Sequence, residues 1–280
     1  MRSFFEQSAP TRTLYYLLNA ALAIFFLAPF YWTITTALKP MQNILVYPPQ
    51  LVPDPVTLDN FYFIWFQRPE VRGYFANSFV VAVGTVVAIV ALSSLAGYGF
   101  AKLHLPLKGP IFASILLGLM IPHQSLLVPL FDIMQRAGLI NTQLGLILIY
   151  VTFQLPFSTY IMRNTFETIP SATLEAARTD GAGEFLIWRV IALPLALPGM
   201  ATVAVLAFIF SWNEFLVALI FTTTDALKTV PVGLAVMMAV YGTQWELLTT
   251  VATLSFIPVI ILFLLTQRVF VRAVAAGAVK

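Results

Sequence analysis

The chain contains no cysteine, which excludes disulfide bonds, thiolate metal ligands and thiol catalysis. It has only two histidines, His104 and His123, and neither has a carboxylate at ligand spacing, which argues against a metal site. It also lacks a Gly-x-x-x-x-Gly-Lys-Ser/Thr pattern, so no phosphate-binding loop and no nucleotide hydrolysis are predicted for this chain. Charged residues make up only 10% of the 280 residues, too few for the surface of an ordinary water-soluble domain of this length.

Hydrophobic residues, by contrast, make up 60% of the chain and lie in long blocks rather than at amphipathic spacing. This composition is typical of an integral membrane protein. Because one helix needs about 20 apolar residues to cross a bilayer, the length fits a single membrane domain of six helices with short connections. The net charge of +3 requires no nucleic-acid partner, since no basic patch is interleaved with aromatic residues. We therefore predict an all-α integral membrane protein.

The apolar blocks predict six transmembrane helices, at residues 14–38, 74–100, 111–134, 144–162, 199–221 and 247–267. Ten of the 15 basic residues then lie on the side that carries both termini. By the positive-inside rule, this side is the cytoplasm. Pro122 and Pro129 in the third span and Pro258 in the sixth predict kinks. The connections 39–73 and 222–246 are expected on the external side.

A few polar side chains inside these spans are candidates for a solute pathway. Glu214 is the one acidic residue well inside a span, where an unpaired carboxylate is costly to bury. It either faces the pathway, or lies near enough to the outer surface to be hydrated or paired structurally, and the sequence leaves both interpretations open. Gln124, Gln154 and Asn213 are further pathway candidates. For these three residues hydrogen bonding between helices is the favoured interpretation.

The longest charged island between two apolar blocks covers residues 175–194. It holds five charged side chains, which are too costly to place in hydrocarbon, so the island is predicted to lie at a membrane surface. Its alanines favour a helix, and the sequence Asp-Gly-Ala-Gly at 180–183 breaks it. We predict a short helix, a sharp turn and a second helix that begins at Glu184.

The island also carries a spaced motif. Glu-Ala-Ala is followed by Gly six positions after the Glu, and by Ile-x-Leu-Pro after nine more residues. The matching residues are Glu175, Ala176, Ala177, Gly181, Ile191, Leu193 and Pro194. This pattern resembles the cytoplasmic EAA loop of ABC importer permeases of the carbohydrate-uptake type, such as the six-span second permease of the maltose importer. Weaker matches lie at 58–61, 212–215 and 276–280.

In the resembled family this loop is the coupling helix that docks in a groove of the ATPase subunit. The resemblance implies an ATPase-coupling role for Glu175, Ala176, Ala177, Asp180, Gly181, Ile191, Leu193 and Pro194. It also implies that the tail residues Gly277, Val279 and Lys280 contact the ATPases.

The same resemblance implies the partners and the location of the chain. The partners are a second homologous permease, two ATPase subunits that bind ATP and Mg²⁺, and an extracytoplasmic solute-binding protein. The chain itself binds no cofactor and forms half of a pore in the cytoplasmic membrane of a bacterium or archaeon. The segment 222–246 is expected to reach into the docked binding protein, with residues 229–233 as a stiff base.

The expected function is therefore the import of a carbohydrate by alternating access, with no bond-breaking chemistry in this chain. An ABC permease for a polyol, a glycerol phosphate or an amino acid fits the same motif, and the sequence does not name the solute. A secondary transporter is a weaker alternative. It would use intramembrane charges or inverted repeats for ion coupling, whereas this chain has one deep carboxylate and no evident repeat.

Overall fold

The structure is a computed structural model and describes residues 9–242 and 244–277. Every regular element in these residues is helical, which confirms the predicted all-α class. The physical reason is that a helix satisfies its backbone hydrogen bonds within its own segment, as hydrocarbon requires. The chain divides into two compact units, residues 1–71 with 234–257 and residues 72–233 with 258–280.

The first unit contains α1 (Ala9–Ala37), a 3-10 turn (Met41–Asn43), α2 (Asp59–Tyr62), a π-helical turn (Phe63–Gln67), most of α12 (Val230–Tyr241) and the start of α13 (Trp245–Gly277). The side-chain amide of Asn60 donates to the carbonyl oxygens of Ala37 and Lys39 at 2.8 and 2.9 Å. These bonds satisfy carbonyl groups that the end of α1 leaves without helical partners. Asn60 thus ties the long connection after α1 back to the helix.

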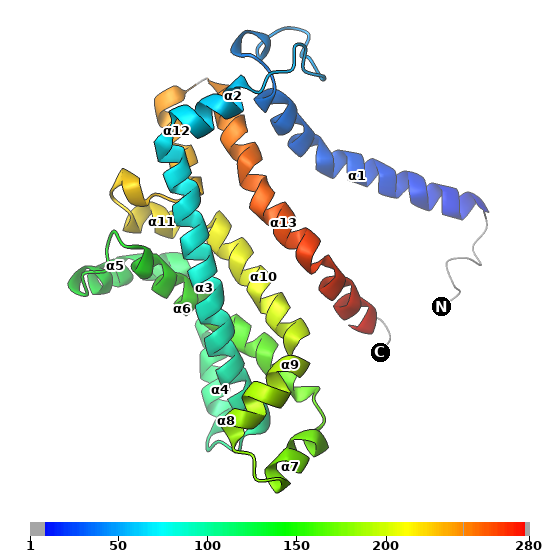
Figure 1. Cartoon of the computed structure of the whole chain (residues 1–280), viewed down its shortest axis with the longest axis vertical. Coiled ribbons are helices and arrows are strands. Elements are labelled where there is room, and N and C mark those ends of the chain that lie inside the picture. Colours follow the sequence, from blue (N-terminus) through cyan, green and yellow to red (C-terminus); the bar gives the residue numbers. More distant parts are fainter. Residues whose placement is uncertain (1–8, 243, 278–280) are drawn as a thin grey trace. The chain divides into compact units, whose positions relative to one another are not determined.

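The second unit contains most of α3 (Pro69–Lys102), α4 (Lys108–Leu117), 3-10 turns at Gly118–Met120 and His123–Leu126, α5 (Leu127–Arg136), α6 (Gln143–Glu167), α7 (Ser171–Thr179), α8 (Glu184–Ile187), a π-helical turn (Trp188–Ala192), α9 (Leu193–Leu195), α10 (Leu197–Asn213), α11 (Leu216–Phe221), a 3-10 turn (Asp225–Leu227) and the rest of α13. Its main apolar core is built by α3, α6 and α10, with Leu174 of α7 and Ile187 of α8 inserted. Figure 1 shows α3 as one continuous helix. The core therefore reaches from the spans into α7 and α8.

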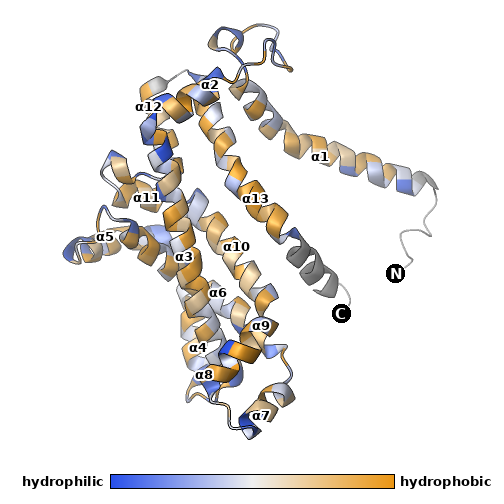
Figure 2. Cartoon of the chain, in the orientation of Figure 1, coloured by the Kyte–Doolittle hydropathy of each residue, from blue (hydrophilic) through white to orange (hydrophobic). Residues whose placement is uncertain are grey.

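Four helices are long and apolar enough to cross a bilayer, at Thr11–Ala37, Pro69–Lys102, Gln143–Glu167 and Trp245–Gln267. Two further helix pairs meet the same criteria when the two helices of each pair are taken together. The pair 108–136 is bent by 93° and the pair 184–213 by 78°. By length and composition the described residues hold four spans, or up to six if each bent pair is one span. Figure 2 shows the hydrophobic residues along α1, α10 and α13.

The structure differs from the prediction at 111–134, which is not one kinked helix. The helix α4 ends at Leu117, and α5 begins at Leu127 after two 3-10 turns. The cause is Pro122, which cannot donate a backbone hydrogen bond and disfavours helical geometry in the residue before it. Ile121 is accordingly extended, with φ −82° and ψ 119°.

The structure also differs at 199–221, where one span was expected. The helix α10 ends at Asn213, Glu214 is extended with φ −69° and ψ 126°, and α11 begins at Leu216. The Glu214 carboxylate accepts the backbone N–H groups of Val217 and Ala218. A side chain that caps free N–H groups in this way favours the start of a new helix over the continuation of the old one.

The segment 222–246, predicted to be an external loop, differs from the prediction as well. Residues 230–241 form the helix α12, with Pro231 in its first turn, where proline is tolerated. The residues before α12 are held by side chains from the turn between α5 and α6 and from α3. Asn141 Oδ1 accepts the backbone N–H groups of Thr223 and Thr224, and the Asn77 amide donates to the carbonyl of Ala226. Residues 222–229 are therefore a strap held by these hydrogen bonds rather than a free loop.

The helices α3 and α6 pack backbone to backbone at Gly97. A Cβ atom at this position would lie 2.6 Å from Met162 Cβ and 2.8 Å from the Arg163 backbone nitrogen. We expect Gly97→Ala to lower the free energy of unfolding by about 1–3 kcal/mol, because α6 cannot easily move away. Thermal unfolding of the detergent-purified chain measures this, with Gly99→Ala as control, since a Cβ there meets only Leu105 at 3.9 Å. Equal melting temperatures for the two variants would contradict the close packing.

Candidate functional sites: the α7 segment and the Glu214 cavity

The charged island forms the predicted short helix, turn and second helix, as α7, residues 180–183 and α8. Gly181 has a φ of +84°, in the left-handed region that favours glycine. Its N–H donates to the carbonyl of Arg178 at 3.0 Å, and the N–H of Ala182 donates to the carbonyl of Ala177 at 3.0 Å. These two bonds form a Schellman motif, which ends α7 and fixes the direction in which the chain leaves it.

Most of α7 is exposed. Leu174 is the buried anchor of the helix, with 1% of its surface exposed. Glu175, Ala176 and Asp180 are exposed and Ala177 is half-buried. Because two of these four motif side chains are only methyl groups, α7 offers a slim surface that a groove in another protein could accommodate.

The later motif residues lie beyond α8. Ile191 belongs to the π-helical turn, and Leu193 and Pro194 belong to α9. Ile191 and Leu193 are half-buried and pack against the core of the second unit, whereas Pro194 is exposed. Ile191 and Leu193 therefore fasten the segment to the spans rather than form part of its exposed surface.

Glu184 connects α8 to two other helices. Its Oε1 lies 2.6 Å from Arg178 Nε across the turn, and its Oε2 accepts the hydroxyl hydrogen of Tyr98 on α3 at 2.8 Å. The hydrogen bond to Glu184 raises the pKa of Arg178 further above its ordinary high value, so the guanidinium is charged at any physiological pH. Lys102, also on α3, donates to the carbonyl of Ile169 at 2.6 Å, just before α7. No sequence pattern pointed to Tyr98 or to this role of Lys102.

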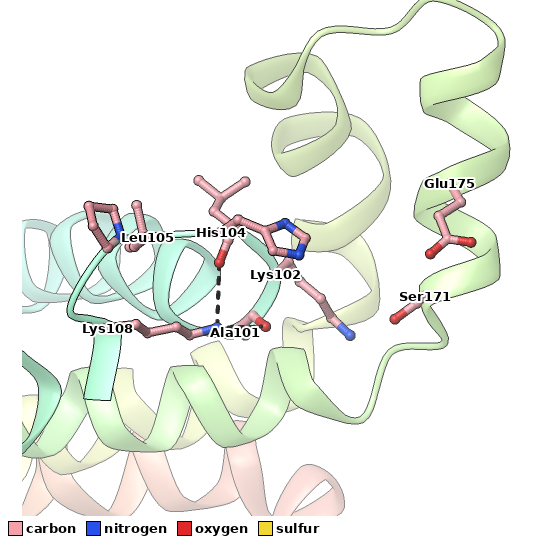
Figure 3. Close-up of a pocket in the computed structure, with 9 residues that line it drawn as sticks. Ala101, Lys102, His104, Leu105, Lys108, Ser171 and Glu175 are labelled. Atoms are coloured by element: carbon pink, nitrogen blue, oxygen red, sulfur yellow. Dashed lines mark hydrogen bonds between the residues drawn. The ribbon is translucent and has the colours of Figure 1, made fainter. Parts of the chain in front are cut away.

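A cavity of about 630 Å³ lies between α7 and the segment 101–108. Figure 3 shows Ser171 and Glu175 on α7 facing the side that carries Lys102, His104 and Lys108. One wall is therefore basic and the other carries a carboxylate. Among the residues that the structure describes, Glu175 has no ion pair, so its carboxylate is available to a partner outside the chain.

The Glu214 carboxylate accepts three hydrogen bonds inside the protein. Its Oε1 accepts the N–H of Val217 at 2.9 Å, and its Oε2 accepts the N–H of Ala218 at 3.0 Å and the hydroxyl of Tyr150 at 2.7 Å. Tyr150 is completely buried on α6. The carboxylate therefore starts α11 and links it to α6, which is the structural pairing that the sequence left open.

The same carboxylate also lines a cavity of about 120 Å³, together with Gln124, His123 and Phe153. The imidazole of His123 stacks on the ring of Phe153, with centroids 4.3 Å apart and planes 7° apart. The structure thus brings two of the predicted pathway residues, Gln124 and Glu214, to one site.

The other two predicted pathway residues do not line this cavity. Asn213 is exposed, and its amide donates to the carbonyl of Ile209 within α10 at 2.8 Å. Gln154 is half-buried on α6.

Of the predicted tail contacts, Gly277 is the last residue of α13, and Val279 and Lys280 lie outside the described residues. No group of three His, Cys, Asp or Glu side chains that could hold a metal ion occurs in the described part of the chain.

Residues 89–276 match the sequence model of a family described as "Binding-protein-dependent transport system inner membrane component". The chain belongs to this family. The permease is 36% identical over 272 residues to the trehalose transport system permease protein SugB of Mycobacterium tuberculosis, covering 96% of this chain and 97% of SugB. It is 35% identical over 264 residues to the trehalose/maltose transport system permease protein MalG of Thermococcus litoralis, covering 92% and 93% of the two chains.

The fold agrees with this assignment. The permease superimposes on a chain from the crystal structure of a bacterial ABC transporter involved in the import of the acidic polysaccharide alginate, with a TM-score of 0.82. The match covers 94% of this chain and 98% of that chain at 21% sequence identity, so it bears on the fold alone. The permease is a multi-pass membrane component of a binding-protein-dependent ABC importer and is not its ATPase. Such an importer also requires an ATPase and a solute-binding protein.

Proposed function

We propose that this permease forms half of the translocation pathway for a carbohydrate and is driven by a separate ATPase. The observation that carries the proposal is the similarity, over nearly the whole length, to permeases named for trehalose and for trehalose and maltose. The alternatives are a polyol, a glycerol phosphate or an amino acid.

The helix α7 is the proposed docking element for the ATPase. Its small side chains let a groove approach the backbone closely, and the exposed Glu175 offers a carboxylate to a basic residue of the partner. Gly181 fixes the turn that keeps α7 projecting from the spans. Asp180 is the C-cap residue of α7, beside this turn.

In the proposed assembly, both termini of the permease lie in the cytoplasm, in keeping with the positive-inside rule. A second homologous permease completes the pore, two ATPase subunits bind ATP and Mg²⁺, and an extracytoplasmic binding protein delivers the solute. This chain holds no cofactor. The end of the chain, including Gly277, Val279 and Lys280, is proposed to contact the ATPases.

The cavity beside Glu214 is the proposed contact with the solute pathway. The Gln124 amide both donates and accepts hydrogen bonds, and Glu214 adds a fixed acceptor. A site of this kind suits a hydroxyl-rich solute, because it rejects solutes that would leave its polar groups unpaired. A volume of about 120 Å³ is smaller than a sugar ring requires, so the cavity is proposed to contact the solute only after the pathway opens.

The function is tested by uptake in cells that lack this chain. We expect the deletion to abolish uptake of one saccharide, measured with radiolabelled trehalose, maltose and other oligosaccharides, and the restored gene to recover it. Uptake of glycerol phosphate and of amino acids should be unchanged. If the deletion removed uptake of one of these other solutes and of no saccharide, the carbohydrate assignment would be wrong while the importer assignment would stand.

A further inference from the structure

The C-terminal end of α3 holds residues 169–184, the α7 segment, at both ends. Lys102 donates to the carbonyl of Ile169 immediately before α7, and Tyr98 donates to Glu184 immediately after the turn that follows α7. Lys102 and Tyr98 are four residues apart and therefore lie on one face of α3. The segment is thus fixed to a helix that does not adjoin it in the sequence.

These two polar contacts rest on a closely packed base. Tyr98 is 4% exposed, and its ring makes a T-shaped contact with Phe166 of α6, with centroids 5.6 Å apart. The neighbouring Gly97 lets the backbones of α3 and α6 approach directly. The Tyr98 side of the bond to Glu184 is thus held by packing, although the Glu184 side chain is 44% exposed, and a close-packed helix pair moves as a unit.

The opposite end of α3 holds the strap before α12. The Asn77 amide donates to the carbonyls of Ala226 and Lys228 at 2.7 and 3.1 Å. Ser78 Oγ accepts the N–H of Val230 at 2.8 Å. The same helix therefore contacts the α7 segment at one end and the strap at the other.

Between these contacts α3 is an uninterrupted helix. Its 34 residues contain proline only at the first position, Pro69. Asn77 and Tyr98 are separated by about 30 Å at the ordinary rise of roughly 1.5 Å per residue. A helix without a kink transmits a displacement along its axis rather than absorbing it at a hinge.

We propose that α3 transmits movement of the α7 segment to the strap 222–229, and that Tyr98 and Lys102 are the positioning residues for this step. The inference rests on the proposed docking of the ATPase on α7. When the ATPase moves α7, the Arg178–Glu184 ion pair makes α8 move with it. The hydrogen bonds from Tyr98 and Lys102 then make α3 move in the same way. Asn77 and Ser78 then shift the strap, which regulates access to the pathway from the external side.

Because the natural chain has no cysteine, the movement is measurable with a single introduced thiol. Ala226→Cys places that thiol in the strap at an exposed position. The assembled importer, with its ATPase and binding protein, is reconstituted in proteoliposomes and labelled with a membrane-impermeant maleimide. The rate is compared without nucleotide and with ATP plus vanadate. We expect ATP to change the labelling rate about fivefold or more, in the usual range of coupling between two sites.

The test variant is Tyr98→Phe combined with Lys102→Met, which removes the two hydrogen bonds but retains the ring and the aliphatic stem. We expect the ATP-dependent change in labelling to fall below about twofold, and uptake per ATP hydrolysed to fall with it, while the amount of co-purified ATPase stays constant. The matched control is Tyr160→Phe on α6, a 41% exposed tyrosine. It should retain the full change in labelling.

The outcomes separate this inference from the proposed function. If the ATPase co-purifies and the labelling rate in the strap responds to ATP equally in the double variant and the control, α3 does not transmit the movement and the inference is wrong. The same conclusion follows if ATP is hydrolysed but the rate never changes when Ala226→Cys is the only substitution. Failure of the ATPase to co-purify with the natural chain would instead overturn the proposed docking on α7.

Discussion

Gly181→Val should leave the permease in the membrane but lower the amount of ATPase that co-purifies with it by about tenfold. Gly181 adopts a φ of +84°, a conformation that costs a residue with a Cβ atom about 1–2 kcal/mol and a β-branched residue more. No atom lies within 4 Å of the position that a Cβ would occupy, so the effect acts through the backbone and not through a clash. The valine therefore opposes the Schellman turn that orients α7.

The measurement is a detergent pull-down through a tag on the permease, with the ATPase quantified by immunoblot and uptake followed in cells. Gly183→Ala is the matched control, because Gly183 has a φ of −72° and equally open surroundings. It should retain the ATPase and transport. Full retention of the ATPase and of uptake in Gly181→Val would show that α7 does not dock the ATPase in the way proposed.

Glu214→Ala should destabilise the permease strongly. It removes the cap of α11 and leaves the hydroxyl of the buried Tyr150 without its acceptor. A lost cap and an unpaired buried hydroxyl together cost about 2–4 kcal/mol. We expect a melting temperature several degrees below that of the natural chain, measured in detergent. Asn213→Ala, which removes only a contact within α10, should melt like the natural chain.

Glu214→Gln separates the structural role of this residue from a role in the pathway, because the amide keeps one acceptor oxygen but loses the charge. If this variant melts near the natural chain and transports poorly, the carboxylate acts on the solute or the gate. If it melts near the natural chain and both uptake and binding-protein-stimulated ATP hydrolysis are normal, Glu214 serves only to cap α11 and hold Tyr150.

Hydrophobic composition and block length were enough to predict an all-helical membrane protein. Burial of apolar residues in a bilayer depends on local sequence, so each long block can be assessed by itself. The helix and turn around Gly181 were also predictable, because alanine, aspartate and glycine act through the backbone of their own neighbours. The seven spaced motif residues identified the family for the same reason, since their arrangement is contained in one short segment.

The breaks at Ile121 and at Glu214 depended on more than the local pattern. Pro122 was visible in the sequence as a kink, but composition does not distinguish a kink from a bend of 93°. At Glu214 the deciding contact is with Tyr150 of α6, 64 residues away, together with two N–H groups that become free only once α11 starts. A hydropathy average does not detect a side chain such as that of Glu214, which accepts backbone N–H groups that would otherwise bond within a continuous helix.

The sequence by itself determined the membrane class, the family and the place of α7, because each of these follows from local physical preferences or from residues at fixed spacing. Tertiary structure alone decided which helix holds α7. Tyr98 and Lys102 look like ordinary residues at the end of a span, and they gain their role only when folding brings Glu184 and Ile169 within hydrogen-bonding distance. Contacts between residues this distant in the chain depend on how the helices pack, and helix packing is set by the whole set of small and large side chains along both surfaces.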